Sequence, residues 1–255
     1  MNQVSAAFIK GLKDNITNKI ALFWVIAWPL IWLFLGFYVF LRQVPAQYLE
    51  QARTQNTVSM ISFAIVIAGM SSLTANIGED RQRGLFLKLK TMPIQPWKDS
   101  AGRILALLVF CFVAIAVILA VGLILGARFD ITLIKALQAL GLFILSILAA
   151  SGVGLMLGSI IKNLQGAIMT GVGIAVVTSV LSGVTFDYSV LPAALQYFSR
   201  FWPISAINNS IIYILTGSFA YNPLTVVNII YAAAISLVFF AAGIIVYTRF
   251  CWRFE

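Results

Sequence analysis

The sequence IALFWVIAWPLIWLFLGFYVFL, residues 20–41, contains no charged side chain over 22 positions. An α-helix needs about 20 consecutive, mainly apolar residues to cross the hydrocarbon core of a bilayer. The stretch therefore predicts a transmembrane helix. Pro29 lies inside it and predicts a kink, which membrane helices tolerate when neighbouring groups satisfy the freed backbone carbonyl.

The composition of the whole chain agrees with a lipid environment. Of its 255 residues, 61% are hydrophobic and 10% are charged, and the mean hydropathy is +0.99. Soluble domains have about a quarter of their residues charged, so this chain has too little polar surface to face water on all sides. It is predicted to be an all-α membrane protein that forms a single transmembrane domain over residues 1–255.

Five more apolar stretches are long enough to cross the bilayer. The predicted spans are residues 57–78, 104–126, 136–161, 165–184 and 224–247. The polar residues 42–56 are predicted to form a loop between the first two spans. The second span is itself unusually polar, because it holds several Ser and Thr residues and Asn76. Such side chains usually face other helices or a wet cavity.

Residues 201–248 form a 48-residue stretch without a charge, about twice the length of one span. Two full spans would place the termini on opposite sides of the membrane. A pair of short re-entrant or interfacial helices at about 190–217, followed by one span, would place them on the same side. Pro203, Asn208 and Asn209 favour the second arrangement. Residues 186–223 are then an external segment and a candidate gate.

The distribution of Lys and Arg supports six spans. Cytoplasmic loops of membrane proteins carry an excess of basic residues. With six spans, 12 of the 17 basic residues lie on the side of the termini. The five on the other side are Arg42, Arg53, Arg128, Lys135 and Arg200. A seventh span would move Arg249 and Arg253 outside and weaken the bias, so both termini are predicted to be cytoplasmic.

Residues 1–19 predict an amphipathic helix. Val4, Phe8, Leu12 and Ile16 recur every four residues, and basic residues occupy other faces. Such a helix lies in the membrane interface with its apolar face in lipid, which makes membrane lipids an expected contact. A disordered basic tail is the alternative.

The sequence contains no pattern for covalent chemistry. It has no histidine, and Cys111 and Cys251 have no metal-ligand spacing. No G-x-x-x-x-G-K-[ST] motif occurs, so the chain does not bind ATP by a P-loop. All eight acidic residues lie outside the predicted apolar cores, which disfavours an intramembrane protease and an ion-driven carrier. The chain is predicted to be no enzyme, to bind no metal and no nucleic acid, and to receive energy from a partner.

The most charged segment reads EDRQRGLFLKLKTMP, residues 79–93. Gly84 separates the second span from a short amphipathic helix at about 84–92, and Pro93 ends that helix. A short helix held between two spans transmits a push from a partner into both. The alternative is a surface helix that serves only to connect the spans.

This segment resembles the signature of the permease subunits of type-two ATP-binding-cassette (ABC) exporters, in particular the drug-exporter branch. The match rests on Arg81, Arg83, the interval from Gly84 to Pro93, the apolar pair after Gly84, and Lys88. Gln82 departs from the pattern, where the family has an acid, and Met92 stands at the usual Thr position. The order of the N-terminal helix, six spans and paired short helices extends the resemblance over the whole chain.

The resemblance implies a half-transporter that works with a separate ATPase subunit, which binds ATP and Mg²⁺, and with a second permease copy or a paralogue. Residues 79–98 are then the cytoplasmic coupling segment. The residues implied for coupling to the ATPase are Glu79, Arg81, Arg83, Gly84, Leu85, Phe86, Leu89 and Pro93.

The second and fifth spans are expected to move and to line the substrate pathway. The polar residues predicted to face that pathway are Ser62, Ser71, Thr74, Thr170, Thr178 and Ser182. Hydroxyl side chains in membrane helices also bond to their own backbone, so a packing role is the alternative for each.

The expected function is ATP-driven export of an amphipathic, drug-like or lipid molecule, by a multi-pass protein of a prokaryotic plasma (inner) membrane. Export of a polysaccharide or lipid-linked glycan is the nearest alternative. A membrane scaffold or sensor subunit without transport, and a small channel, are alternatives of other classes. The sequence names no substrate and does not distinguish a homodimer from a heterodimer.

Overall fold

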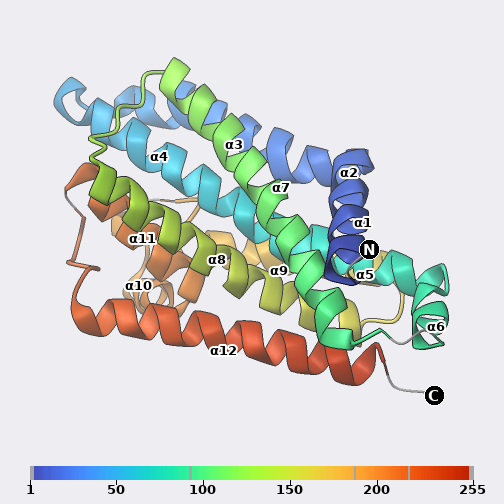
Figure 1. Cartoon of the computed structure of the whole chain (residues 1–255). Coiled ribbons are helices and arrows are strands. Elements are labelled where there is room, and N and C mark those ends of the chain that lie inside the picture. The colour runs from blue at the N-terminus through green and yellow to red at the C-terminus, as the bar shows by residue number, and fades with distance from the viewer. Residues whose placement is uncertain (1–2, 92–93, 187, 218, 253–255) are drawn as a thin grey trace.

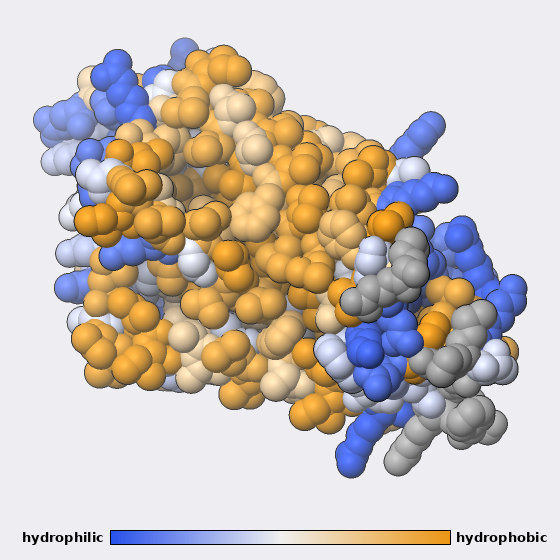
Figure 2. Space-filling model, viewed as in Figure 1, coloured by the Kyte–Doolittle hydropathy of each residue, from blue (hydrophilic) through white to orange (hydrophobic). Residues whose placement is uncertain are grey.

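The computed structural model describes residues 3–91, 94–186, 188–217 and 219–252, which form helices joined by short turns (Figure 1). Within these ranges there is no β-strand, and six helical segments are long and apolar enough to cross a membrane. The predicted all-α fold with six spans is confirmed. Figure 2 shows the result on one face of the molecule, where a broad apolar band separates polar groups at its two ends.

The N-terminal helix α1 (Gln3–Thr17) packs against the start of α7 (Pro96–Ile124). A Cβ on Gly102 would lie 2.5 Å from the Cβ of Ala7, so the two helices touch through their smallest side chains. In Figure 1, α1 runs across the long axis of the bundle, beside the start of α7. The predicted helix is therefore present, and its place in the membrane interface stays a prediction.

The first span consists of α2 (Lys19–Leu22), the π-helical turn η1 (Phe23–Ala27) and α3 (Trp28–Tyr38), and the 3₁₀ turn η2 (Phe40–Gln43) follows it. The Asn18 side chain caps its beginning by accepting from two backbone N–H groups. The wider turn η1 ends two residues before Pro29, which has no N–H and would clash with a regular preceding turn. A π-helical turn therefore stands next to the position where the kink is predicted.

The second span is longer than expected. The segments α4 (Ala46–Ile67), η3 (Ala68–Ser72) and α5 (Leu73–Gln82) make one continuous helix of 37 residues. The predicted loop at 42–56 is wrong from Ala46 onward. Residues 46–56 are polar but include good helix formers such as Ala, Leu, Gln, Glu and Arg, and only the part of a helix that lies in lipid has to be apolar.

This long helix is the centre of the bundle, and 94% of its apolar window is buried inside the protein. It contacts α3, α7, α8 (Leu133–Ile160), α9 (Leu164–Leu181) and α11 (Pro203–Thr216). Glycines let its neighbours approach closely. A Cβ on Gly154 would lie 1.9 Å from the carbonyl oxygen of Gly69, and one on Gly171 would lie 2.4 Å from that of Met70.

Two short helices precede the last span, as predicted. After the 3₁₀ turn η4 (Tyr188–Val190), α10 (Ala193–Phe201) and α11 (Pro203–Thr216) meet at Trp202, and α12 (Val226–Phe250) follows. Most of α11 is buried, against α4, α8 and α12, whereas α10 buries only Ser199. The burial of α11 meets the requirement for a non-spanning segment at membrane depth. We therefore give α11 the name of the predicted re-entrant helix, and its depth in the membrane stays a prediction.

The remaining boundaries differ from the predicted spans by a few residues. The largest shift is in α7, which begins at Pro96 instead of residue 104 and so includes Asp99 and Arg103. The short helix α6 (Leu85–Lys90) lies inside the range predicted for it. In Figure 1, α1, α6 and the end of α12 lie at one end of the bundle, here named the α6 end. The opposite end, which carries η2 and the start of α12, is named the outer end.

The crossing of α8 and α12 depends on glycines in both helices. A Cβ on Gly152 would lie 2.2 Å from the carbonyl oxygen of Phe239, and one on Gly243 would lie 2.4 Å from that of Gly152. Gly141, also in α8, is exposed and has nothing within 4 Å of such an atom. The two positions therefore form a matched pair.

We expect Gly152→Ala to destabilise the folded chain by about 1–3 kcal/mol, because the added methyl group meets backbone atoms that cannot rotate away. Gly141→Ala is expected to leave stability unchanged or slightly raised, since Ala favours a helix over Gly. Thermal unfolding of both variants in the same detergent measures the difference. Equal midpoints for the two variants would contradict the tight crossing.

Candidate functional site

The helix α6 begins after a sharp turn at Gly84. The backbone of Gly84 has φ of 68°, in the left-handed region that side chains disfavour. This turn ends α5 at Gln82 and sends the chain into α6 in a new direction. The exposed side chain of Arg83 pairs with the half-buried Glu79 before the turn.

The two faces of α6 have opposite environments. Phe86 is 5% exposed and packs edge-on against the rings of Tyr247 and Trp252, near the end of α12. Leu87, the next residue, is 70% exposed. Leu85 and Leu89 are half-buried, and Lys88 is exposed. One face of α6 is thus fixed to the bundle, and the other offers an apolar and a basic side chain.

The guanidinium of Arg81 closes the end of α8. It donates to the carbonyl oxygens of Ile161 and Ser159, each at 2.8 Å, and one of its nitrogens lies 3.3 Å from the Cys251 sulfur. These carbonyls lie at a helix C-terminus, where they lack partners within the helix and carry partial negative charge. Arg81 therefore ties α5 to the end of α8 and to the residue after α12.

A buried cluster of charges joins α5 to α1 and α7. The guanidinium of Arg103 contacts Asp80 at 2.7 Å and Asp99 at 2.8 Å, and the three side chains are 4–9% exposed. The Lys10 ammonium donates to both carboxylate oxygens of Asp80, at 2.6 and 2.8 Å. The Tyr247 hydroxyl of α12 donates to Asp99. Four helices thus meet in one network.

The strength of this network follows from its burial. Charges removed from water lose a large hydration energy, which is regained only when each has well-placed partners of opposite charge. Arg103 has two carboxylates, and its guanidinium carbon also lies 5.6 Å from the Phe86 ring centroid. A second hydrogen bond joins α5 to α1, because the Asn76 amide donates to the Asn15 side chain at 2.7 Å. The helices at the α6 end are therefore held to one another by buried, paired polar groups.

The structure separates the residues predicted for coupling into two groups. Arg81 and Phe86 make contacts inside the bundle, whereas Arg83 is exposed and pairs with the half-buried Glu79. Pro93 lies outside the described residues. Asp80, Asp99, Arg103, Lys10 and Tyr247 were not predicted for this site, and neither was Leu87. The i,i+4 spacing of Asp99 and Arg103 was the one visible signal for the cluster.

The residues predicted for the pathway also have different environments. Those on the central helix are buried: Ser62 donates to Asn208 at 2.7 Å, Ser71 is 6% exposed, and Thr74 donates to the Met70 and Gly154 carbonyls. Ser182 is fully buried, while Thr170 and Thr178 on α9 are half-buried. Whether any of them faces a substrate stays a prediction.

An open cavity of about 420 Å³ lies at the outer end, between the start of α4, the turn before α8 and the end of α11. The lining residues are Gln47, Glu50, Gln51, Thr54, Arg128, Phe129, Asp130, Leu215 and Thr216. Most of them are polar. The cavity touches both the central helix and the re-entrant helix, so a movement of either one changes its shape.

Comparison with known proteins adds one match. A family model described as "ABC-2 type transporter" matches residues 2–216. No curated protein matches the chain.

We expect Arg103→Met to destabilise the chain by about 3–5 kcal/mol, because it leaves Asp80 and Asp99 buried with less compensating charge. Arg83→Met, the same substitution on an exposed residue of the same end, is expected to cost less than about 1 kcal/mol. Unfolding in detergent measures both. Adding Asp99→Asn to Arg103→Met restores the charge balance and is expected to recover part of the loss. Equal effects of the two single substitutions would contradict the buried network.

Proposed function

Because the chain belongs to the ABC-2 type transporter family, as a membrane-spanning component without a catalytic site, we propose that it exports an amphipathic, drug-like or lipid molecule. Proteins of this family work with ABC ATPase subunits, so the energy comes from a separate chain. We expect that partner, and not this chain, to hold ATP and Mg²⁺. The basic α6 end is then cytoplasmic, in the plasma (inner) membrane of a prokaryote.

The observation that carries this proposal is the exposed face of α6. Leu87 is 70% exposed beside the exposed Lys88, at the end of the bundle that gathers most basic residues. Because Phe86 holds the opposite face of α6 against the bundle, Leu87 and Lys88 are the side chains that this helix offers to another protein. A groove in the ATPase would accept Leu87, and acidic groups at its rim would accept Lys88 and Arg83.

The contacts at the α6 end give a route by which a movement of the ATPase can reach the membrane-spanning helices. A push on α6 reaches α12 through Phe86, and it reaches α8 through Arg81 at the end of α5. The network of Asp80 and Arg103 carries the same push into α7 and α1. Because these contacts are buried and mutually satisfied, we expect the α6 end to move as one body.

The fifth and sixth spans leave most of their surface for other contacts. In α9 and α12, 22% and 17% of the apolar window is buried, against 94% in the central helix. The exposed stripe of α9 consists of Gln165, Met169, Gly173, Val177 and Leu181. We propose that a second copy or a paralogue faces α9, and that substrate passes between the copies beside Thr170 and Thr178 toward the outer cavity.

The glycan-export alternative gains no support from the aromatic residues of the first span. Trp24 of η1 and Trp28 and Trp32 of α3 contact one another in sequence, tilted and edge-on, with ring centroids 5.2 and 6.4 Å apart, and they pack against the core. A ladder of rings in contact with one another is explained by helix packing. An exporter of this kind requires an ATPase and a scaffold does not, and the following experiment tests this difference.

We expect Leu87→Asp to abolish copurification of the ATPase, because the substitution puts a charge into an apolar contact. Val190→Asp serves as the matched control, since Val190 is 77% exposed on the side away from α6. The tagged chain is purified in mild detergent with each substitution, and copurifying subunits are identified by mass spectrometry. Unchanged ATPase binding by Leu87→Asp would overturn the contact on α6. Absence of any ATPase from the unsubstituted chain would favour the scaffold or channel alternatives.

A further inference from the structure

Arg200, in the last turn of α10, is held by aromatic rings. Its guanidinium carbon lies 4.5 Å from the Tyr221 ring centroid, and 5.9 Å from the centroids of Tyr188 and Tyr197. Its Nε donates to the Tyr188 hydroxyl at 2.8 Å. Among the residues that the structure describes, no carboxylate lies within ion-pair distance of this guanidinium. The ring contacts fix the orientation of the cation without neutralising its charge.

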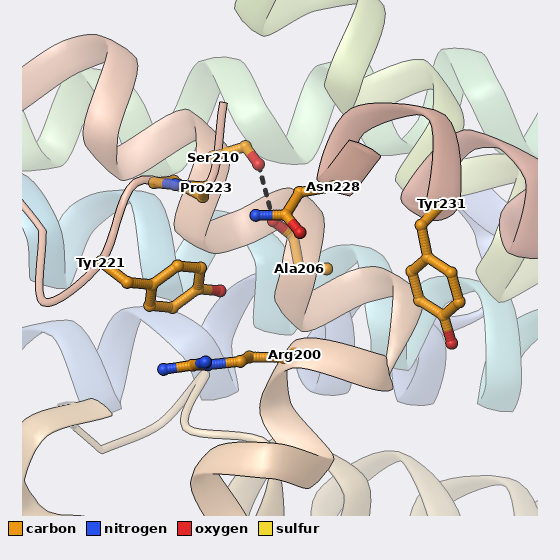
Figure 3. A pocket seen from close by; sticks show the side chains of 7 residues that line it. All are labelled: Arg200, Ala206, Ser210, Tyr221, Pro223, Asn228 and Tyr231. Atoms are coloured by element: carbon orange, nitrogen blue, oxygen red, sulfur yellow. Dashed lines mark hydrogen bonds between the residues drawn. The ribbon is translucent and has the colours of Figure 1, made fainter. Parts of the chain in front are cut away.

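A small cavity adjoins the guanidinium. Its volume is about 20 Å³, which is room for one water-sized group. The lining residues are Arg200, Ala206, Ser210, Tyr221, Pro223, Asn228 and Tyr231. Figure 3 shows the guanidinium lying along the Tyr221 ring, with Asn228 and Tyr231 of α12 on another side of the cavity.

The hydroxyl of Tyr221 adds a second donor. It accepts from the Asn209 amide at 3.2 Å, so its own hydrogen is available. Burial raises the pKa of Tyr221 above its ordinary value of 10.0, so the phenol keeps this hydrogen at neutral pH. A fixed cation and a protonated phenol beside one water-sized space suit a negatively charged oxygen acceptor.

The surface around this cavity is apolar and exposed. The exposed fractions are 61% for Tyr197, 60% for Phe201, 72% for Val226, 75% for Val227 and 62% for Ile230. The beginning of α12 thus carries exposed apolar side chains, with tyrosines and an arginine beside them. This combination is typical of the level at which the hydrocarbon of a membrane meets the headgroups. An anion that is attached to apolar chains can place its charge at Arg200 and its chains on this surface.

We propose that Arg200 and Tyr221 bind the phosphate of a phospholipid headgroup in the outer leaflet. One phosphate oxygen occupies the small cavity, and the acyl chains lie along the first turns of α12. Arg suits this ligand because its planar guanidinium can donate two parallel hydrogen bonds to a phosphate. The choice of the outer leaflet rests on the proposed orientation with the α6 end in the cytoplasm, whereas the phosphate site itself involves neither α6 nor an ATPase.

The test measures lipid binding by the full purified chain in detergent. Dioctanoyl phosphatidylglycerol is expected to raise the thermal unfolding midpoint, and Arg200→Gln is expected to weaken this binding at least ten-fold. Arg200→Lys keeps the charge without the planar fork and is expected to have an intermediate effect. Arg42→Gln is the matched control: Arg42 is an exposed arginine of η2 at the same outer end, and its removal should leave lipid binding unchanged.

The outcomes show whether the site binds phosphate and whether that phosphate belongs to a lipid or is free in solution. Dioctanoylglycerol, which has no phosphate, should give no shift that depends on Arg200. Equal shifts with the two lipids, or an undiminished shift in Arg200→Gln, would overturn the proposal. A shift dependent on Arg200 with inorganic phosphate alone would overturn the lipid source while supporting the phosphate site. If Arg200→Gln does not fold, Tyr221→Phe removes one donor and is expected to weaken binding several-fold.

Discussion

The enclosure of the second span by its neighbours is the constraint on which the bundle depends. A helix with no lipid-facing side must satisfy every polar group within the protein. Thr74 does so through the carbonyls of Met70 and Gly154, and Ser62 through Asn208 of the re-entrant helix. Tight enclosure also needs close helix approach, which explains why glycines stand at the crossings of α8 and α9 with η3.

The same enclosure connects the two ends of the molecule. At the α6 end, Arg81 and Asp80 on α5 contact α8, α1 and α7. At the outer end, α4 borders the cavity that α11 also lines. One continuous helix therefore contacts both the proposed ATPase-binding region and the proposed exit, with the π-helical segment η3 between them. Such segments occur often at functional sites.

Much of the fold could be predicted from the sequence, because a span in lipid must be apolar and cytoplasmic loops are basic. The beginnings of α4 and α7 were missed, since outside lipid a helix no longer carries an apolar signal. The segment at 79–93 was recognised from its order of charge, Gly and Pro. The cluster of Asp80, Arg103 and Lys10 was not, because its members are up to 93 positions apart in sequence. Hydroxyl residues such as Ser62 have the same polarity whether they pack or line a pathway.

The buried second span also affects the order of assembly during biosynthesis. The chain emerges from the ribosome N-terminus first, so residues 46–82 enter the membrane before Gly154 or Asn208 has been made. During that interval Thr74 still has the Met70 carbonyl of its own helix as an acceptor, at 2.7 Å. The hydrogen bond from Ser62 to Asn208 forms only after α11 has been made. A nascent chain of this protein therefore holds its future core in lipid, and the last third of the sequence closes it.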